Sequence, residues 1–306
     1  MSAIRVVTRS DREEWDRSVA ASDADCVLFL SSYMDYHADR FKDASLVAVL
    51  GDGRLAAFPA SINEGKVISH AGLTFGDLQL PPGVSFTEIE ATYRAIVDHY
   101  LSLGVSALVI KQTPECFLSQ YSPQLIPALK LSKSIEHDGA AVDLRRPLVV
   151  TAKRRPRVQR AMLSHSFREE SLPSFWPLLE SVLSSRHDVR PVHTEQEMAS
   201  LMQGAAGRIR IFGARKDGRL LAGAVLYLSR HAVHVQYMAT NDEGRNTHAL
   251  DALLFWLMER HSTEVSWFSM GISNERDGSL NQGLFDYKMS FGAVRIAHVT
   301  NEYALS

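Results

Sequence analysis

Cysteine is scarce in this sequence. Only Cys26 and Cys116 occur among 306 residues, and neither lies in a Cys-x-x-Cys motif or a Cys/His cluster. We therefore predict no disulfide framework and no metal site, and a reducing compartment fits. Long apolar runs are also missing. No window approaches the roughly 18–20 apolar residues of a membrane helix, and the first residues lack a secretory pattern, so we expect a cytoplasmic protein without a membrane span.

A charge excess of either sign is absent as well. The chain has 33 basic and 35 acidic residues and a formal net charge of -2, so the molecule as a whole is not built to bind polyanions. Apolar residues make up 45% and charged residues 22%, which is typical of a globular protein with a core. The length suits two domains of ordinary size.

The order of predicted elements in the first half recurs in the second half. We expect strands at 45–51, 55–62 and 66–71, and again at 208–214, 220–228 and 232–239. Asp-Gly turns join the first two strands of each set, because such a turn needs positive φ. The segment Gly51–Ala57 reads Gly-Asp-Gly-Arg-Leu-Ala-Ala, and Lys216–Ala222 reads Lys-Asp-Gly-Arg-Leu-Leu-Ala. By this alignment His70 and His234 fall at similar offsets in the third strands.

Each half then continues through a polar loop into a helix and a strand. Ser85 and Glu88 form a capping pattern before a helix that ends at Gly104, and a buried strand follows at 107–110. In the second half a loop at 240–246 precedes a helix with apolar residues from Leu250 to Met258 and a strand at 265–270. Further helices are expected at 174–185 and after the capping patterns Ser10/Glu13 and Thr194/Glu197.

This order of elements resembles the GNAT acyltransferase module, and its duplication resembles the Fem-type aminoacyl transferases and tandem-GNAT sugar N-acyltransferases. The local matches are Ser69–Asp77, Lys111–Pro114, Lys153–Arg157, Arg186-His187 with Pro191–His193, His234–Tyr237, Asn281–Leu284 and Tyr287–Gly292. The resemblance implies an α+β protein of two tandem GNAT-like modules, 1–140 and 141–306. Each module is a mostly antiparallel mixed sheet flanked by helices.

The resemblance also implies that two neighbouring strands part, so that the activated donor lies between them like an added strand. Simple GNAT enzymes hold coenzyme A with a Gly-rich arginine loop after the third strand. The loop here offers one glycine, in Gly244-Arg245-Asn246, and we assign these three residues to donor binding. The predicted donor is an acyl-CoA co-substrate, with no tightly bound cofactor.

Acyl transfer to an amine requires a neutral amine, donors for the oxyanion and a stabilised leaving group. His234 is a candidate base and Tyr237 a candidate acid, with Gln236 in donor binding. Strand alternation places His234 and Gln236 on one face and Tyr237 on the other. The alternatives are a hydrogen-bonded core histidine and a tyrosine that packs across strands.

The first module supplies the candidate acceptor contacts. The resemblance implies that Asp77 orients the acceptor nitrogen and accepts its proton, with His70 and Phe75 beside it. The alternative for Asp77 is an Asx turn. Arg155 and Arg157 belong to a stretch from Arg145 to Arg160 that contains no acid. A solvated face is the ordinary fate of such a run, but here we assign these two arginines to phosphates of the acceptor.

The closing segment contains the last candidates. Lys288 would neutralise the oxyanion or a donor phosphate, and Asn281 and Tyr287 would bind the donor. The alternative for Lys288 is an exposed strand lysine. Arg186, His187 and His193 follow a helix, and we expect them to cap its C-terminus.

We therefore predict an N-acyltransferase that moves an acyl group from acyl-CoA to a nucleotide-linked amino sugar in cell-surface polysaccharide biosynthesis. One alternative is a Fem-type ligase that uses aminoacyl-tRNA and acts on a peptidoglycan precursor. A second is a non-catalytic RNA- or nucleotide-binding protein that keeps the fold and uses the Arg145–Arg160 stretch.

Overall fold

The structure is a computed structural model that describes residues 4–119, 129–187 and 190–305. The chain forms two compact units: unit 1 comprises Met1–His137 and Ala297–Ser306, and unit 2 comprises Asp138–Ile296. The chain passes between the units twice, once in a strand at Lys130–Asp143 and once in a strand at Val294–Ala304. The division into acyltransferase modules after residue 140 stays a prediction.

Unit 1 contains two sheets with helices around them. Its elements in chain order are β1 (Arg5–Thr8), α1 (Arg12–Ala21), η1 (Val27–Phe29), α2 (Ser31–Asp35), β2 (Lys42–Asp43), β3 (Leu46–Val49), β4 (Leu55–Phe58), β5 (Ser61–Asn63), β6 (Lys66–Ile68), α3 (Phe86–Ser102), β7 (Ala107–Lys111), η2 (Glu115–Phe117), β8 (Lys130–Asp143) and the end of β14 (Val294–Ala304). Strands β1, β3 and β4 form an antiparallel sheet, and the second sheet has the order β2-β5-β6-β7-β14.

The strand predicted at 55–62 is two strands in the structure. β4 ends at Phe58 and pairs with β3, whereas β5 begins at Ser61 and pairs with β6 in the other sheet. Pro59 lies at the break, where its ring removes the backbone donor that a continuing ladder would need. The third strand is also shorter than predicted, because β6 ends at Ile68 and leaves His70 outside it.

Helix α3 begins and ends where the sequence predicts. The Ser85 hydroxyl accepts a hydrogen bond from the Glu88 amide, and Gly104 follows the last turn with φ +75°. The Glu88 carboxylate does not complete the capping box, because it accepts a hydrogen bond from the Gly51 amide instead. At α1 the cap is Asp11, which accepts from the Glu14 amide, so the expected Ser10/Glu13 pattern is wrong by one residue.

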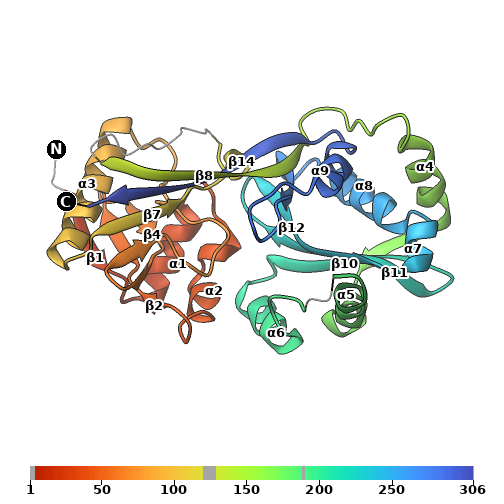
Figure 1. Cartoon of the computed structure of the whole chain (residues 1–306), viewed down its shortest axis with the longest axis horizontal. Coiled ribbons are helices and arrows are strands. Elements are labelled where there is room, and N and C mark those ends of the chain that lie inside the picture. Colours follow the sequence, from red (N-terminus) through yellow and green to blue (C-terminus); the bar gives the residue numbers. More distant parts are fainter. Residues whose placement is uncertain (1–3, 120–128, 188–189, 306) are drawn as a thin grey trace. The chain divides into compact units, whose positions relative to one another are not determined.

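Unit 2 is a sheet with helices on both faces (Figure 1). Its elements are α4 (Arg155–Ser164), β9 (Ser166–Glu169), α5 (Leu172–His187), α6 (Glu195–Gly204), β10 (Ile209–Lys216), β11 (Arg219–Leu228), β12 (Ala232–Thr240), α7 (Asp242–Asn246), α8 (Ala249–His261), β13 (Trp267–Ile272) and α9 (Gln282–Met289), with parts of β8 and β14. The strand order is β8-β13-β12-β11-β10-β9. The capping box at Thr194 and Glu197 is confirmed in full.

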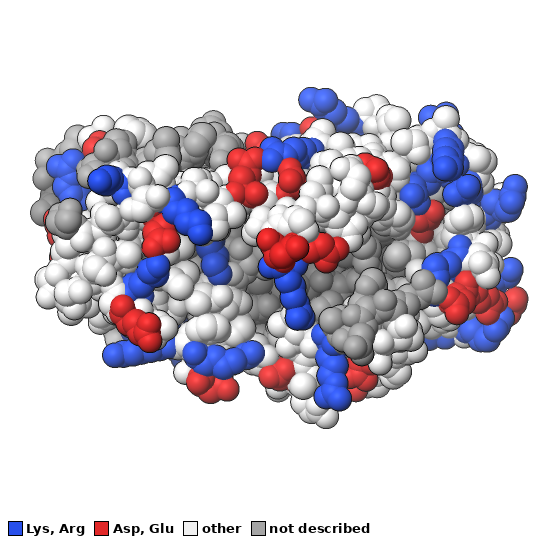
Figure 2. Space-filling view, viewed as in Figure 1, with Lys and Arg blue, Asp and Glu red and all other residues white. Residues whose placement is uncertain are grey.

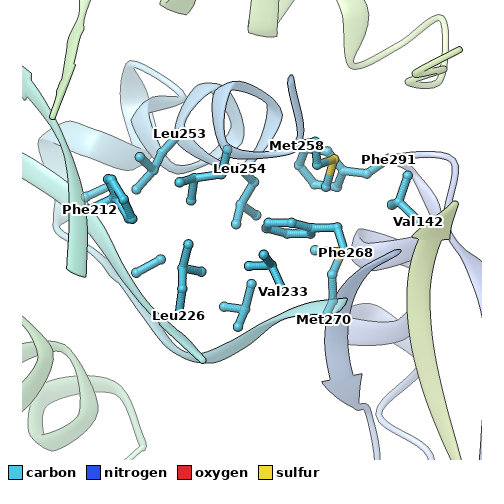
Figure 3. Close-up of a cluster of buried hydrophobic side chains, with 14 of the residues drawn as sticks. Val142, Phe212, Leu226, Val233, Leu253, Leu254, Met258, Phe268, Met270 and Phe291 are labelled. Atoms are coloured by element: carbon cyan, nitrogen blue, oxygen red, sulfur yellow. The ribbon is translucent and has the colours of Figure 1, made fainter. Parts of the chain in front are cut away.

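The core of unit 2 lies between the sheet and α8. Val233, Leu226 and Phe268 point from the strands toward Leu253 and Leu254 of the helix (Figure 3). All five are fully buried, and burial of such side chains contributes about 1.5–3 kcal/mol each. Helix α5 covers the opposite face with Phe175 and Trp176, so this sheet is buried on both sides.

The two units share one topological feature. The strand before the long helix pairs in parallel with the strand after it: β6 with β7 in unit 1, and β12 with β13 in unit 2. The other ladders described above are antiparallel. The expected fold class, a mostly antiparallel mixed sheet flanked by helices, is therefore confirmed.

Candidate functional site

The neighbouring strands β12 and β13 part after three residue pairs. Ala232, Val233 and His234 pair with Trp267, Phe268 and Ser269, yet β12 continues to Thr240 and β13 to Ile272. Beyond His234, β12 keeps its partner β11 on the other side. Among the described residues, no strand pairs with this side of β12 beyond His234, and we call this side the open edge of β12.

A β-bulge at this edge changes which side chains share a face. Val225 pairs with Tyr237 and Leu226 with Val235, so Gln236 is an extra residue on β12. His234 lies opposite Tyr227, and Tyr227 and Val225 share a face because they are two residues apart. His234 and Tyr237 are therefore on the same face, and the expected placement of Tyr237 on the opposite face is wrong.

His234 stands where the two strands begin to part. It is 9% exposed, and its Nδ1 atom lies 3.0 Å from the Ser269 hydroxyl. Gly271, two residues further along β13, has φ +69°, and a Cβ built on it would lie 3.2 Å from Cε1 of His234. Two features thus favour glycine at this position: the left-handed backbone, and the His234 ring, which leaves little room for a side chain.

Lys288 approaches the same glycine from α9. Its Nζ atom donates to the carbonyl oxygens of Gly271 at 3.0 Å and Ile272 at 2.6 Å, and the residue is 2% exposed. The alternative of an exposed strand lysine is therefore wrong. An ammonium has three donors, so two carbonyls leave one N–H for a ligand. Burial lowers the pKa of Lys288 to about 8.

Two other residues predicted in the closing segment have structural partners. The Asn281 side chain caps α9 by accepting from the Leu284 amide, and it donates to Glu275. The Tyr287 hydroxyl donates to Asp251 at 3.0 Å, and the Arg154 guanidinium lies over its ring at 4.6 Å. Tyr287 also lines a pocket, described next.

A pocket of about 410 Å³ opens between α4, α7 and α8. Its lining includes Arg157, Gly244, Arg245, His248 and Tyr287. The structure thus brings together residues that the sequence assigned separately to donor and acceptor. The segment predicted as a loop at 240–246 contains the short helix α7, which Asn241 caps by accepting from the Gly244 amide.

Arg157 is the cation of this pocket that remains available. Arg245 donates to the Thr240 carbonyl and pairs with Asp242, and Arg154 pairs with Asp251 at 2.5 Å. Within the described part of the chain, the Arg157 side chain makes no hydrogen bond or ion pair, and the residue is exposed. Arg155 and Asn246 are exposed outside the pocket lining. Basic side chains gather over α4, at the upper right of Figure 2.

Gly244 has a packing role in this pocket. A Cβ there would lie 2.4 Å from the Leu221 carbonyl oxygen and 2.4 Å from Oγ1 of Thr240. The glycine thus lets α7 approach β11 closely, which is a reason for its presence apart from donor binding.

Tyr237 has a partner that the sequence did not reveal. Its hydroxyl lies 2.6 Å from Nδ1 of His193, and their rings meet edge to face at 5.9 Å. His193 is 4% exposed and precedes α6, and its expected role as a cap at the C-terminus of the preceding helix stays a prediction. The side chains of Arg186 and His187 lie outside the described part. No local signal pairs His193 with Tyr237, because the two belong to separate elements.

In unit 1, His70 lies just after β6 in left-handed backbone, with φ +54°. It is 3% exposed, its Nδ1 atom has no hydrogen-bond partner among the described residues, and its ring lies 5.5 Å from that of His37. Burial lowers the pKa of His70 to about 3, with smaller contributions from His37, Lys111 and Arg9. Lys111 binds the loop itself, donating to the carbonyls of His70, Ala71 and Leu73.

Asp77 is buried at the end of the same loop. Its Oδ1 atom accepts from the Tyr93 hydroxyl and from the Leu78 amide. Burial raises the pKa of Asp77 to about 6, against the opposing effect of these hydrogen bonds. Asp77 lines a pocket of about 180 Å³ together with Asp23, Gln112 and Thr113.

Phe75 lies in the core of unit 1 rather than in that pocket. It is 2% exposed, with Phe117 at 4.6 Å and Phe29 at 5.9 Å between ring centroids. Among the residues that the structure describes, no group of three His, Cys, Asp or Glu side chains is arranged to hold a metal ion. Nor does any described helix have both the length and the apolar character needed to cross a membrane.

Comparison with known proteins finds a family model that matches residues 150–289. This segment, which holds the parted strands and the α7 pocket, matches the family model described as Acetyltransferase (GNAT) domain. No curated protein matches the sequence. The match confirms the expectation of a GNAT-type acyltransferase in the second half of the chain.

Solved structures extend the likeness of fold over the whole chain. FemX matches with a TM-score of 0.70 over 98% of this chain and 97% of that chain, at 11% identity. A protein of unknown function from Bacteroides thetaiotaomicron matches with a TM-score of 0.62 over 99% and 100% of the two chains, at 11% identity. The C-terminal domain of a putative lysylphosphatidylglycerol synthetase from Agrobacterium fabrum gives 0.59 over 97% and 93%, at 12% identity. At these identities the likeness concerns the fold alone.

Proposed function

We propose that this protein transfers an acyl group from an acyl-CoA thioester to the amine of a nucleotide-linked amino sugar. The observation that carries the proposal is the parting of β12 and β13 after His234 and Ser269. The amide-containing arm of coenzyme A hydrogen-bonds to the open edge of β12 as an added strand does. The thioester carbonyl then lies near the point of parting.

The residues around Gly271 suit the chemistry at that carbonyl. Lys288 presents its third N–H to the oxyanion that forms when the amine attacks. His234, whose ring lies beside Gly271, accepts the proton that the attacking amine loses. Gln236 and Tyr237 follow on the same strand, and Tyr237 protonates the leaving sulfur.

The α7 pocket supports a phosphate-bearing donor. Arg157 faces it without a partner in the described chain, and a guanidinium pairs with phosphate oxygens in two parallel hydrogen bonds. We assign Arg157 to the donor in this proposal rather than to the acceptor, because it shares the pocket with Gly244 and Arg245. Asp77 in unit 1 is proposed to bind the acceptor amine, with a pKa close enough to neutrality to exchange a proton.

A second candidate donor is an aminoacyl-tRNA. The observation that favours it is the exposed basic face of α4, which carries Arg155, Arg157 and Arg160 and follows Lys153 (Figure 2). An extended polyanion would contact all of these charges, whereas the phosphates of one coenzyme A fill a single pocket.

A donor screen tests the proposal. Acetyl-, longer acyl- and hydroxyacyl-CoA are offered with a panel of nucleotide amino sugars, and thiol release is followed. Release that requires both substrates supports the acyl-CoA assignment. Transfer from charged tRNA without release from any CoA overturns it in favour of the second candidate. Salt-sensitive RNA binding with no transfer from any donor overturns both and identifies a binding protein.

A further inference from the structure

We propose that His193 is a positioning residue for acyl transfer, which holds the Tyr237 hydroxyl and returns a proton to it after Tyr237 has protonated the leaving group. This inference rests on the proposed function and adds a residue to it. The resemblance includes His193 in the match Pro191–His193, but it does not pair this residue with Tyr237. The contact comes from the structure.

The Tyr237 hydroxyl is held from two sides. Nδ1 of His193 lies 2.6 Å from its oxygen, which is a short hydrogen bond. The Trp176 ring, fully buried on α5, meets the Tyr237 ring edge to face at 5.9 Å. The phenol therefore has little freedom to rotate away from His193.

His193 is itself fixed by the start of α6. The next residue, Thr194, forms a complete capping box with Glu197, in which the Thr194 amide donates to Glu197 at 2.6 Å. A capping box restrains the backbone at the first turn of a helix. The buried ring of His193 thus projects from a rigid position onto β12.

The bulge at Gln236 brings this pair to the reacting face. It places Tyr237 on the face of His234, next to the edge where β12 and β13 part. Without the extra residue, Tyr237 would follow strand alternation to the opposite face, where α8 covers the sheet. Bulges near functional sites re-aim side chains in this way.

Tyr237 and His193 transfer protons in turn when the leaving group departs. When the carbon–sulfur bond breaks (or the carbon–oxygen bond of an ester donor), the leaving atom takes the hydroxyl proton of Tyr237. The phenolate takes a proton from Nδ1 of the His193 imidazolium, which becomes neutral. His193 regains its proton from solvent, while the proton lost by the attacking amine passes to solvent through the base.

The decisive variant is His193→Asn, because the asparagine amide can occupy the place of Nδ1 and keep the hydrogen bond to Tyr237. It cannot deliver a proton. We expect the fold to be retained, kcat to fall at least about 10-fold and KM to stay within about twofold. His193→Asn with the kcat of the wild type overturns the inference.

Chemical rescue provides the second measurement. Imidazole should restore part of the turnover lost in His193→Ala but none in the double variant with Tyr237→Phe. The matched control is His261→Ala, which removes another buried histidine that is bonded to a carboxylate in the same unit. Equal rescue of all three variants overturns the inference. If the wild type transfers no acyl group from any donor, the proposed function itself is overturned. That result differs from an active wild type in which His193 proves dispensable, which overturns only this inference.

Discussion

Gly271 lies directly against the imidazole of His234. A Cβ at Gly271 would be 3.2 Å from Cε1 of that ring, and the glycine has φ +69°. Because the carbonyl oxygen of Gly271 also accepts from Lys288, this one residue contacts both proposed catalytic side chains. The site therefore depends on the shape of the backbone at the end of β13.

Gly271→Ala is expected to reduce both stability and turnover. Left-handed backbone costs an alanine about 1–2 kcal/mol, and the added methyl group displaces the His234 ring by a few tenths of an ångström. Equilibrium unfolding in denaturant and kcat measure the two effects. Gly207→Ala is the matched control, since Gly207 has φ +79° and nothing within 4 Å of the added Cβ. It should lose similar stability and keep its turnover; equal loss of turnover in both variants would contradict the role of the His234 contact.

Lys288→Met is expected to change the pH dependence of stability. The pKa of Lys288 is lowered to about 8 from 10.5, so between these values the unfolded chain binds more protons than the folded one. The contribution of Lys288 to the free energy of unfolding therefore rises with pH between about 8 and 10.5. Unfolding free energies from pH 8 to 10 should increase in the wild type relative to Lys288→Met. A constant difference would show that the buried lysine is not titrating as described. The variant should also lose turnover, because its carbonyl partners and the oxyanion lose their donor.

Asp77→Asn should cost far more turnover than stability. The amide keeps an oxygen for the Tyr93 hydroxyl and the Leu78 amide, but it cannot accept a proton from the acceptor. Turnover of the wild type should rise with pH near 6, following the raised pKa of Asp77. Between 3.8 and about 6 the folded protein binds more protons, so its stability should fall with rising pH relative to Asp77→Asn. If Asp77→Asn instead loses much stability while turnover per folded molecule stays unchanged, Asp77 has only a structural role in the loop.

Tyr93→Phe should raise the pKa of Asp77 further. The Tyr93 hydroxyl donates to the carboxylate and so favours its charged form. The carboxyl carbon shift of Asp77, titrated by NMR in both proteins, measures this change. A lower pKa in the variant would contradict the hydrogen-bond assignment. The hydroxyl of Tyr100, which donates to the Ala44 carbonyl in the same unit, offers the matched control Tyr100→Phe.

Arg157→Ala and Arg160→Ala distinguish the two donors. Both arginines are exposed on α4, but only Arg157 lines the α7 pocket. With an acyl-CoA donor, Arg157→Ala should raise the donor KM roughly 10-fold or more and Arg160→Ala should have little effect. With charged tRNA, each variant should weaken binding and reduce its dependence on salt. Unchanged KM values in both variants would remove the pocket from donor binding.

Local pattern was enough to predict much of the fold. Asp217-Gly218 and its flanking apolar strands predicted the hairpin of β10 and β11, and Ser85 with Gly104 predicted both ends of α3. The parting of two neighbouring strands was expected only through the family resemblance. Pro59 shows where the pattern misled, since the apolar run at 55–62 concealed a change of sheet that depends on which partners each half finds.

Hydrophobic periodicity and turn chemistry act over a few residues, so the amino-acid sequence settled the order of helices and strands, the duplicated arrangement and the residue types available near the third strands. Tertiary packing settled the rest. The bulge at Gln236 exists only in the register of β12 against β11, and the His193–Tyr237 hydrogen bond joins residues 44 positions apart. The burial of Lys288 likewise requires the end of β13 to meet α9. Such contacts depend on how elements dock, and no local preference of the chain encodes that docking.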